Sequence, residues 1–398
     1  MAQSKIVIIS DVHLSDGQSY SWFKDDSTLK GFLNQTAHDP QVKELVLLGD
    51  VFDVWLYPIQ VAPWDAKKII QKWSGIITAL QSCAAKLPKV YYINGNHDMG
   101  VTQADLSLIS PNIEVISATQ YNAQHPNTLH LEHGHLVDMF NAPDISGDPI
   151  QGLPFGYFVT RLVATAGNHD EIWNALSDIV KSHFGKISSY NSFVQQMNGS
   201  SMWRGFFEGF IEALLEDFIR KAGKLLIEAL VDLLVEYVKL ADSSVNDNSN
   251  ILLPNGAKVN IGEVKKHYHK LLLNWFKKYG LADLYNTATA STGLDWYAEK
   301  LLSQSTAKTV VMGHTHHGQC LSIANGQYVN SGCWCAKAQP TYVEVTLQAA
   351  PTVVLKSYPE NAVIPCLMPM HSLEMAAPVM EREETMPQME QKCSDQPQ

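Results

Sequence analysis

Cysteine is scarce in this 398-residue sequence, which contains only six, at irregular intervals. So few and so unevenly spaced cysteines do not resemble the disulfide framework that holds small secreted domains together. The N-terminus leads into the apolar run Ile6–Ile9 without a charged leader or a small-residue cleavage site, so a secretory signal is not expected. These absences predict a cytoplasmic protein with reduced cysteines.

An excess of positive charge is also missing. The chain has 29 lysines and arginines against 40 aspartates and glutamates, a formal net charge of −11. Such a chain has no general attraction for nucleic-acid phosphates or anionic lipid, so nucleic acid is not favoured as a partner. We expect a small-molecule partner, and the sequence does not indicate an oligomeric state.

A long uninterrupted apolar run is the third absence. The most apolar region, residues 225–240, is divided by Glu228, Asp232 and Glu236. Charges at this spacing exclude a simple membrane span. Association of this region with a membrane surface stays open.

Several short runs rich in valine and isoleucine have the composition of buried strands. They are Ile6–Ile9, Leu45–Leu48, Val90–Ile93 and Val310–Met312. Two alternating segments, Tyr342–Leu347 and Thr352–Tyr358, predict a β-hairpin. Helical patterns near Ser27–Ala37 and Ala66–Lys86 separate the first three strands. The fold class predicted from this order is α/β, with layered sheet and helices.

The pattern changes over residues 150–304, where strand signals vanish and amphipathic helices are predicted. In Met202–Leu240, phenylalanines recur at helical spacing and predict a face packed in a core, with a hydrophobic lid or partner surface as the alternative. We therefore predict a core in two parts, residues 1–149 and 305–358, around a helical insertion over 150–304. A polar loop is expected over Ala241–Asn260, and a disordered tail over 359–398.

Five short polar segments follow the ends of predicted strands and carry most of the metal-binding side chains. They are Asp11-Val-His13, Gly49-Asp50-Val-Phe-Asp53, Gly95-Asn96-His97-Asp98, His133-Gly-His135 and Gly313-His314-Thr-His316. Carboxylate oxygens, imidazole nitrogens and an amide oxygen form a ligand set suited to manganese, iron or zinc. Two ions held close together need a shared ligand, and the carboxylate of Asp50 is the natural candidate. The glycines before the ligands are expected to let the backbone turn sharply.

The ordered series of segments resembles the calcineurin-like metallophosphoesterases, over residues 5–140 and 305–358. The resemblance implies a β-sandwich flanked by helices and two divalent metal ions, with hydrolysis of a phosphomonoester or phosphodiester by a hydroxide that bridges the two ions. It also implies the ligands. One ion takes Asp11, His13, Asp50 and His316, and the other takes Asp50, Asn96, His133 and His314.

Catalytic roles are predicted for His97 and Asp53. His97 is adjacent to the ligand Asn96 and is expected to protonate the leaving group, while Asp53 orients the imidazole. His135 and Asp98 are predicted to lie behind the ligands. The choice between His133 and His135 as the ligand stays open, although the family places its ligand just before the glycine.

Two further motifs are interpreted as structural. Gly167-Asn-His-Asp170 repeats the letters of Gly95–Asp98, but it lies in a helical setting and comes after His133, so it is interpreted as coincidence, with a place for His169 in the cleft as the alternative. Cys320, Cys333 and Cys335 have the wrong spacing for a zinc knuckle or a thioredoxin motif and are interpreted as small buried residues.

The substrate is not specified by these motifs. The layout is similar to the UDP-diacylglucosamine pyrophosphohydrolase branch, but that branch has arginine where this chain has His97. A phosphomonoesterase or phosphodiesterase with a small substrate is therefore the main hypothesis, and a pyrophosphohydrolase of a nucleotide-linked lipid precursor is the alternative. A metal-stabilised interaction scaffold is the non-enzymatic alternative.

Overall fold

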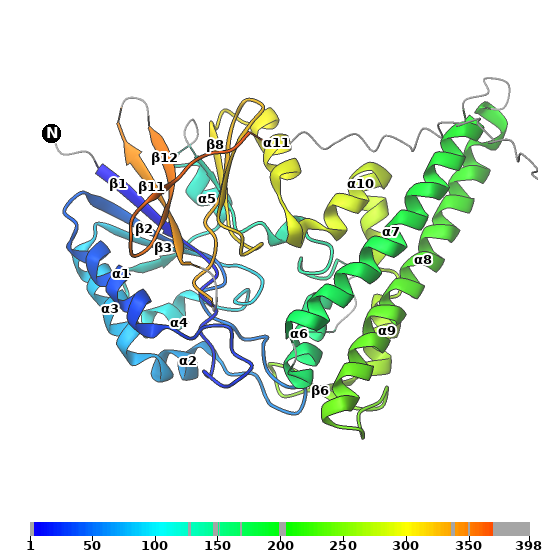
Figure 1. Cartoon of the computed structure of the whole chain (residues 1–398), viewed down its shortest axis with the longest axis horizontal. Coiled ribbons are helices and arrows are strands. Elements are labelled where there is room, and N and C mark those ends of the chain that lie inside the picture. The colour runs from blue at the N-terminus through cyan, green and yellow to red at the C-terminus, as the bar shows by residue number, and fades with distance from the viewer. Residues whose placement is uncertain are drawn as a thin grey trace, which may run out of the picture.

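The computed structural model describes residues 4–125, 129–145, 150, 152–167, 169–198, 204–335, 339–348 and 351–368. The side chains of residues 169–170 and 188–214 lie outside this description. Two sheets and several layers of helices form a mixed α/β fold, which confirms the predicted class (Figure 1).

The larger sheet has seven strands in the order β13-β12-β11-β1-β2-β3-β4. The pairs β1–β2, β2–β3 and β3–β4 are parallel, and β1–β11, β11–β12 and β12–β13 are antiparallel. The predicted strands and the predicted hairpin are confirmed. The bounds are β1 Ser4–Ile9, β2 Val42–Leu48, β3 Lys89–Ile93, β4 Ile113–Val115, β11 Thr341–Leu347, β12 Thr352–Ser357 and β13 Val363–Ile364.

The smaller sheet has four strands in the order β5-β8-β10-β9, and it packs against the larger one. Alternate residues of β1 lie on the two faces of the larger sheet. Ile6 and Ile8 face the smaller sheet, while Val7 and Ile9 face helices. Burial on both faces explains why these strands are continuously apolar. The bounds are β5 Leu129–Leu131, β8 Thr309–Met312, β9 Gln319–Ile323 and β10 Gly326–Asn330.

Helices cover the outer face of the larger sheet, as the sequence predicts. The pattern over Ala66–Lys86 forms two helices and not one, because the backbone leaves helical geometry at Trp73, whose indole N–H donates to the Ser15 carbonyl at 2.6 Å. This bond ties the helix junction to the loop after β1. The bounds are α1 Asp26–His38, α2 Ala66–Lys72, α3 Ser74–Lys86, α4 Gln103–Ser107 and α5 Ala118–Asn122.

The region predicted as an insertion contains mainly helices, most of which share one hydrophobic core that Trp55 and Ile59 also join, whereas α11 packs on the smaller sheet. The long helices α7 and α8 run side by side and extend away from the sheets (Figure 1). The phenylalanine-rich start of α8 lies outside the described side chains, but Ile219, farther along the helix, is buried in this core. The bounds are η1 His135–Val137, α6 Phe155–Ala166, α7 His169–Asn198, α8 Arg204–Ala241, α9 Ile261–Tyr268, α10 Leu271–Ala288, η2 Ala290–Thr292 and α11 Asp295–Gln304.

The segment expected to be a polar loop, Ala241–Asn260, contains a small hairpin instead. Strands β6 (Asn250–Leu252) and β7 (Lys258–Asn260) pair in antiparallel fashion around a turn in which Gly256 has φ +83°. The apolar side chains Ile251 and Val259 belong to the core of the helical region. Three-residue strands are too short to give a clear alternating pattern, so the sequence does not reveal them.

The chain continues in regular structure past the predicted boundary at residue 358, since β13 extends the larger sheet. A disulfide joins Cys320 of β9 to Cys366, which departs from the expectation of reduced cysteines. The rest of the predicted tail, residues 369–398, lies outside the described residues. Within the described part of the chain, none of the helices has the length and apolar character needed to cross a membrane.

Candidate metal centre

The five polar segments meet at one edge of the two sheets. Strands β1, β2 and β3 are parallel, so the segments that follow them emerge at the same edge. Strand β5 is parallel to β8, which brings the His133 and His314 segments together in the smaller sheet. The carboxyl ends of parallel strands are the usual place for a site in an open α/β sheet.

The backbone is strained at this edge. Five of the seven predicted ligands have left-handed conformations: Asp11 (φ 52°), His13 (57°), Asp50 (53°), His314 (72°) and His316 (61°). Non-glycine residues rarely adopt positive φ, at a cost on the order of 1–3 kcal/mol each, and such residues cluster at functional sites. The strain directs these side chains toward a common point.

Three glycines make room for the same side chains. Gly49 has φ +83°, which fits the predicted sharp turn, whereas Gly95 and Gly313 are not in the left-handed region. Glycine is needed at these two positions because a carboxylate oxygen lies close to each backbone. A Cβ on Gly95 would lie 2.2 Å from Asp50 Oδ1, and a Cβ on Gly313 would lie 2.4 Å from Asp11 Oδ2.

Asp11, His13 and His316 form the first group of side chains able to hold a metal ion. His316 Nε2 lies 3.3 Å from Asp11 Oδ1 and 3.0 Å from His13 Nε2. His13 Nδ1 lies 3.2 Å from Asp53 Oδ2, so this nitrogen is placed to donate its proton and to leave a lone pair on Nε2.

Asp50, His133 and His314 form the second group. His133 Nδ1 donates to the Leu48 carbonyl at 2.8 Å, which leaves the lone pair of Nε2 facing Asp50 Oδ2 at 3.1 Å. The same Oδ2 lies 3.9 Å from His13 Nε2. The carboxylate of Asp50 therefore reaches both groups, as a shared ligand must.

Buried acceptors without donors indicate that a cation fits here. Asn96 Oδ1 is buried and has no hydrogen-bond partner, and His133 Nε2 is buried with the Asp50 carboxylate beside it at 3.1 Å. Burial alone lowers the pKa of His133, but the carboxylates of Asp50 and Asp11 outweigh it and raise the pKa to about 10. The electrostatic field of these carboxylates therefore favours a positive charge at this position. The oxygen and nitrogen donors are those that manganese, iron and zinc prefer.

His97 and Asp53 lie together beside the two groups. His97 Nδ1 is 3.0 Å from Asp53 Oδ1, which also accepts from the backbone N–H groups of Trp55 and Leu56 at 2.9 Å each. Burial lowers the pKa of His97, but Asp53 and then Asp50 outweigh it, so the pKa of His97 is raised. The indole of Trp55 lies against the imidazole, with 4.5 Å between ring centroids.

His135 and Asp98 lie outside both groups. His135 is buried, its Nδ1 has no hydrogen-bond partner, and burial together with the charge of His133 lowers its pKa. Asp98 accepts from the backbone N–H groups of Val51 (2.8 Å) and Gly95 (2.7 Å). It therefore ties the loop after β2 to the loop after β3, behind the predicted ligands.

Two residues at the site are not singled out by the sequence. Asp138 Oδ2 lies 3.0 Å from His314 Nε2, which leaves Nδ1 of that imidazole free to act as a ligand. Trp22 packs against three imidazoles, with centroid separations of 4.7 Å to His13, 5.4 Å to His97 and 5.5 Å to His316. For Asp138, the sequence offers one clue, its position five residues after His133. For Trp22, the sequence offers none.

A cleft of about 1060 Å³ opens over the site. Its floor includes Asp50, Asn96 and His97, and its walls include apolar side chains of the helical region. Those side chains are Phe155, Val159, Leu176, Val180 and Leu230. The second Gly-Asn-His-Asp sequence lies where α6 ends and α7 begins: Gly167 lines the cleft, whereas the side chain of His169 lies outside the description.

Comparison with known proteins identifies a family that the first part of the sequence matches. Residues 4–150 match the calcineurin-like phosphoesterase family. The chain is similar to a UDP-2,3-diacylglucosamine hydrolase from Blochmanniella floridana, with 34% identity over 116 residues, 28% of this chain and 41% of that protein. It therefore spans less than half the length of this curated relative. Phosphopantetheinyl hydrolase from Mycobacterium tuberculosis aligns with 83% of this chain and 90% of its own at 11% identity, with a TM-score of 0.22, which is too low to support an argument.

Proposed function

We propose that this chain, whose residues 4–150 belong to the calcineurin-like phosphoesterase family, is a metal-dependent hydrolase of a phosphomonoester or phosphodiester. The observation that carries the proposal is the convergence of two ligand groups on the carboxylate of Asp50. Four further ligand atoms around it come from imidazoles held by hydrogen bonds or by neighbouring carboxylates.

Two divalent ions, of manganese, iron or zinc, would be held by the residues that the resemblance assigns. One group is Asp11, His13, Asp50 and His316, and the other is Asp50, Asn96, His133 and His314. When bound, the ions lower the pKa of a water nucleophile and neutralise charge on the phosphoryl oxygens. The protein supplies the fixed ligand positions, because Asp53, Asp138 and the Leu48 carbonyl each hold one imidazole by its other nitrogen.

His97 is proposed to give a proton to the leaving alkoxide. Its Nδ1 faces Asp53, which leaves Nε2 for the substrate, and the side chain lines the cleft. The neighbouring carboxylates favour the imidazolium form, which can act as a general acid. Asp53 fixes the ring, and Trp55 restricts its movement by contact.

The substrate is proposed to be a small molecule. A cytoplasmic location is proposed with it, against which the Cys320–Cys366 disulfide counts. A nucleotide-linked lipid precursor, cleaved at its pyrophosphate, is the second candidate. The apolar wall of the cleft favours it, since acyl chains need such a surface. So does the similarity to a protein named UDP-2,3-diacylglucosamine hydrolase.

Two assays test these proposals. The metal-depleted protein is reconstituted with Mn²⁺ and assayed on p-nitrophenyl phosphate and on bis(p-nitrophenyl) phosphate. Hydrolysis of either ester supports the phosphoesterase, whereas two bound ions with no hydrolysis of either would support a scaffold. A screen of metabolites and nucleotides then identifies the substrate class.

The second candidate is tested by comparing nucleotide diphosphates with and without acyl chains. Val159→Trp narrows the apolar part of the cleft. For a lipid-linked substrate, the variant is expected to raise KM for the acylated compound far more than for p-nitrophenyl phosphate. Equal KM changes for both would contradict the lipid candidate.

A further inference from the structure

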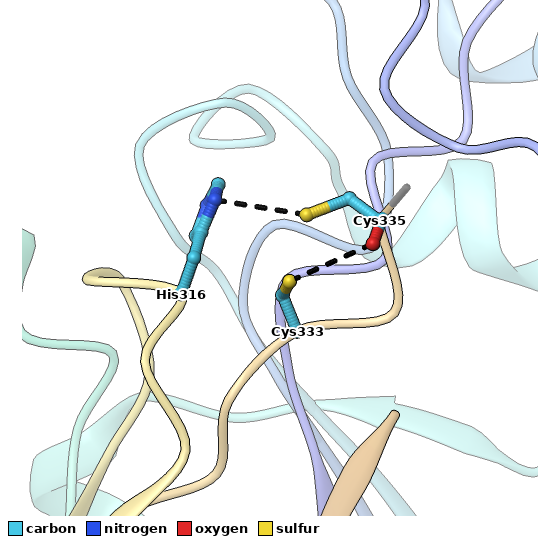
Figure 2. A group of neighbouring side chains, drawn as sticks. All are labelled: His316, Cys333 and Cys335. Carbon is cyan, nitrogen blue, oxygen red and sulfur yellow. Dashed lines mark hydrogen bonds between the residues drawn. The ribbon is translucent and has the colours of Figure 1, made fainter. Parts of the chain in front are cut away.

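Two cysteines lie together with one imidazole beside the proposed metal centre. Cys333 and Cys335 follow strand β10, and His316 follows strand β8. These strands are parallel neighbours, so the loops at their carboxyl ends meet. The two sulfurs and a nitrogen of His316 all lie within 4.8 Å of one another. Figure 2 shows the imidazole facing the Cys335 sulfur, and the distance from Nδ1 to Sγ is 3.6 Å.

This arrangement differs from that of an ordinary buried cysteine. Cys83 is packed among apolar side chains of the helical layer, and its thiol donates to the Leu33 carbonyl at 3.2 Å. Cys333 and Cys335 line the cleft over the site, although each is less than one tenth exposed. The Cys333 sulfur makes a long contact, 3.8 Å, with the Cys335 carbonyl, and it also lies beside the Cys335 sulfur (Figure 2). Small ions can therefore reach two thiols that have weak partners.

We propose that Cys333, Cys335 and His316 Nδ1 form a third metal site, selective for a thiophilic ion such as Zn²⁺ or Cd²⁺. Two thiolates and one imidazole are a typical donor set for such ions, and three protein ligands leave a fourth position open toward the cleft. Mn²⁺ prefers oxygen donors, so it is a poor partner for the two thiolates, and the site differs in donor type from the two oxygen- and nitrogen-based groups around Asp50. Both cysteines are buried, as the sequence interpretation expects, and the proposal adds a binding role.

His316 connects this site to the proposed hydrolytic centre. Its Nδ1 faces Cys335, and its Nε2 faces Asp11 at 3.3 Å. A neutral imidazole has one lone pair, so it can serve only one of two ions without losing its remaining proton. An ion at the cysteine site therefore competes with an ion at the Asp11 group for His316. This competition rests on the proposed function, whereas the cysteine site itself does not.

The site is tested by following thiolate-to-metal charge-transfer absorption while the full-length protein, with its Cys320–Cys366 disulfide intact, is titrated with Cd²⁺. All proteins carry Cys393→Ser, so that the thiol outside the described residues cannot contribute. One equivalent of Cd²⁺ is expected to produce the absorption, which Cys333→Ser/Cys335→Ser removes and Cys83→Ser keeps. Absorption that persists in the double variant, or none in the parent protein, would overturn the proposal.

A second measurement needs no substitution at the site. Zn²⁺ is added to the parent protein, which is then alkylated with iodoacetamide, and labelling is located by peptide mass. Zn²⁺ is used in excess over three equivalents, because the two groups around Asp50 can also take it, and protection of Cys333 and Cys335 then supports the site. Equal labelling with and without Zn²⁺ contradicts it, even if the double variant fails to fold.

Competition for His316 is tested by repeating the Cd²⁺ titration in saturating Mn²⁺. The Cd²⁺ concentration at half-maximal absorption is expected to rise about 5- to 150-fold, the usual range for coupled sites. An unchanged midpoint would overturn the sharing of His316. If the absorption forms but the protein has no phosphoesterase activity, the result supports the cysteine site and contradicts the proposed function.

Discussion

His97 Nδ1 lies 3.0 Å from Asp53 Oδ1, and both side chains are almost fully shielded from solvent, with exposed fractions of 7% and 0%. The same carboxylate holds His13 at 3.2 Å through its other oxygen. Asp53 therefore orients the proposed proton donor and one proposed metal ligand at once. Its own position is fixed by the backbone N–H groups of Trp55 and Leu56.

Replacement of the proposed proton donor should depend on the leaving group. In His97→Ala, hydrolysis of phenyl phosphate is expected to fall by roughly 10²- to 10⁴-fold, the range for general acid catalysis. Hydrolysis of p-nitrophenyl phosphate should fall much less, because p-nitrophenolate leaves without protonation. The kcat values of both esters, measured with Mn²⁺, provide the check. A similar decrease for both would contradict the role of His97.

Asp53→Asn should lower activity without unfolding the loop. The amide oxygen can still accept from the backbone of Trp55 and Leu56, but the negative charge that favours the imidazolium of His97 is lost. We expect kcat to fall by about 10²-fold or more, with a smaller change in KM. Steady-state kinetics together with thermal unfolding test this expectation. Full activity in a folded Asp53→Asn protein would show that the carboxylate charge is not needed.

Gly95→Ala and Gly100→Ala form a matched pair. A Cβ on Gly95 would lie 2.2 Å from Asp50 Oδ1, whereas a Cβ on Gly100 would have no atom within 4 Å. Gly95→Ala is therefore expected to displace the shared carboxylate and to weaken Mn²⁺ binding by at least about tenfold, equivalent to ~1.4 kcal/mol. Gly100→Ala should leave Mn²⁺ binding near its original value. Calorimetric titration measures both, and equal affinities would refute the close-approach argument.

The buried guanidinium of Arg161 should contribute strongly to stability. It donates to the carbonyls of Tyr57, Pro58 and Leu252 at 2.6–2.7 Å, and so joins α6 to the loop beyond Asp53 and to strand β6. Arg161→Met removes these charge-assisted hydrogen bonds, and should lower the free energy of unfolding by roughly 3 kcal/mol or more. The Pro58 and Leu252 carbonyls keep the Val61 N–H and the Tyr157 hydroxyl as donors.

The control for Arg161 is Arg220→Met, which removes an exposed helical ion pair with Asp217. Exposed pairs of this kind contribute little to stability, because solvent screens the charges. Urea unfolding, followed by circular dichroism, compares the two variants. If Arg161→Met were no more destabilised than Arg220→Met, the bracing role of Arg161 would be wrong.

Local signals explain what could be predicted from the sequence. Runs such as Ile6–Ile9 are apolar on both faces because both faces are buried, and the polar residues that follow them must emerge at one edge of a parallel sheet. Sequence order alone therefore brings Asp11, Asp50 and Asn96 together. The two groups of side chains able to hold a metal ion contain six of the seven residues that the family resemblance implies as ligands, all but Asn96, and His133 lies in one of them whereas His135 does not.

Features that depend on distant contacts could not be predicted. The left-handed backbone at Asp11 and Asp50 is imposed by the surrounding loops, and neither residue type requires it. Gly95 is needed because Asp50 approaches from another strand, which no local pattern records. The pairing of Cys320 with Cys366 and the approach of Cys333 to His316 likewise arise only when β8, β9 and β10 assemble.

The central claim is that two ions sharing Asp50 make this protein a phosphoesterase. The most direct test measures hydrolysis of bis(p-nitrophenyl) phosphate and p-nitrophenyl phosphate while the metal-depleted protein is titrated with Mn²⁺. Activity on at least one ester should appear only as the second ion binds, and Asp50→Asn should abolish it. Full activity without added metal, or two bound ions with hydrolysis of neither ester, would contradict the claim.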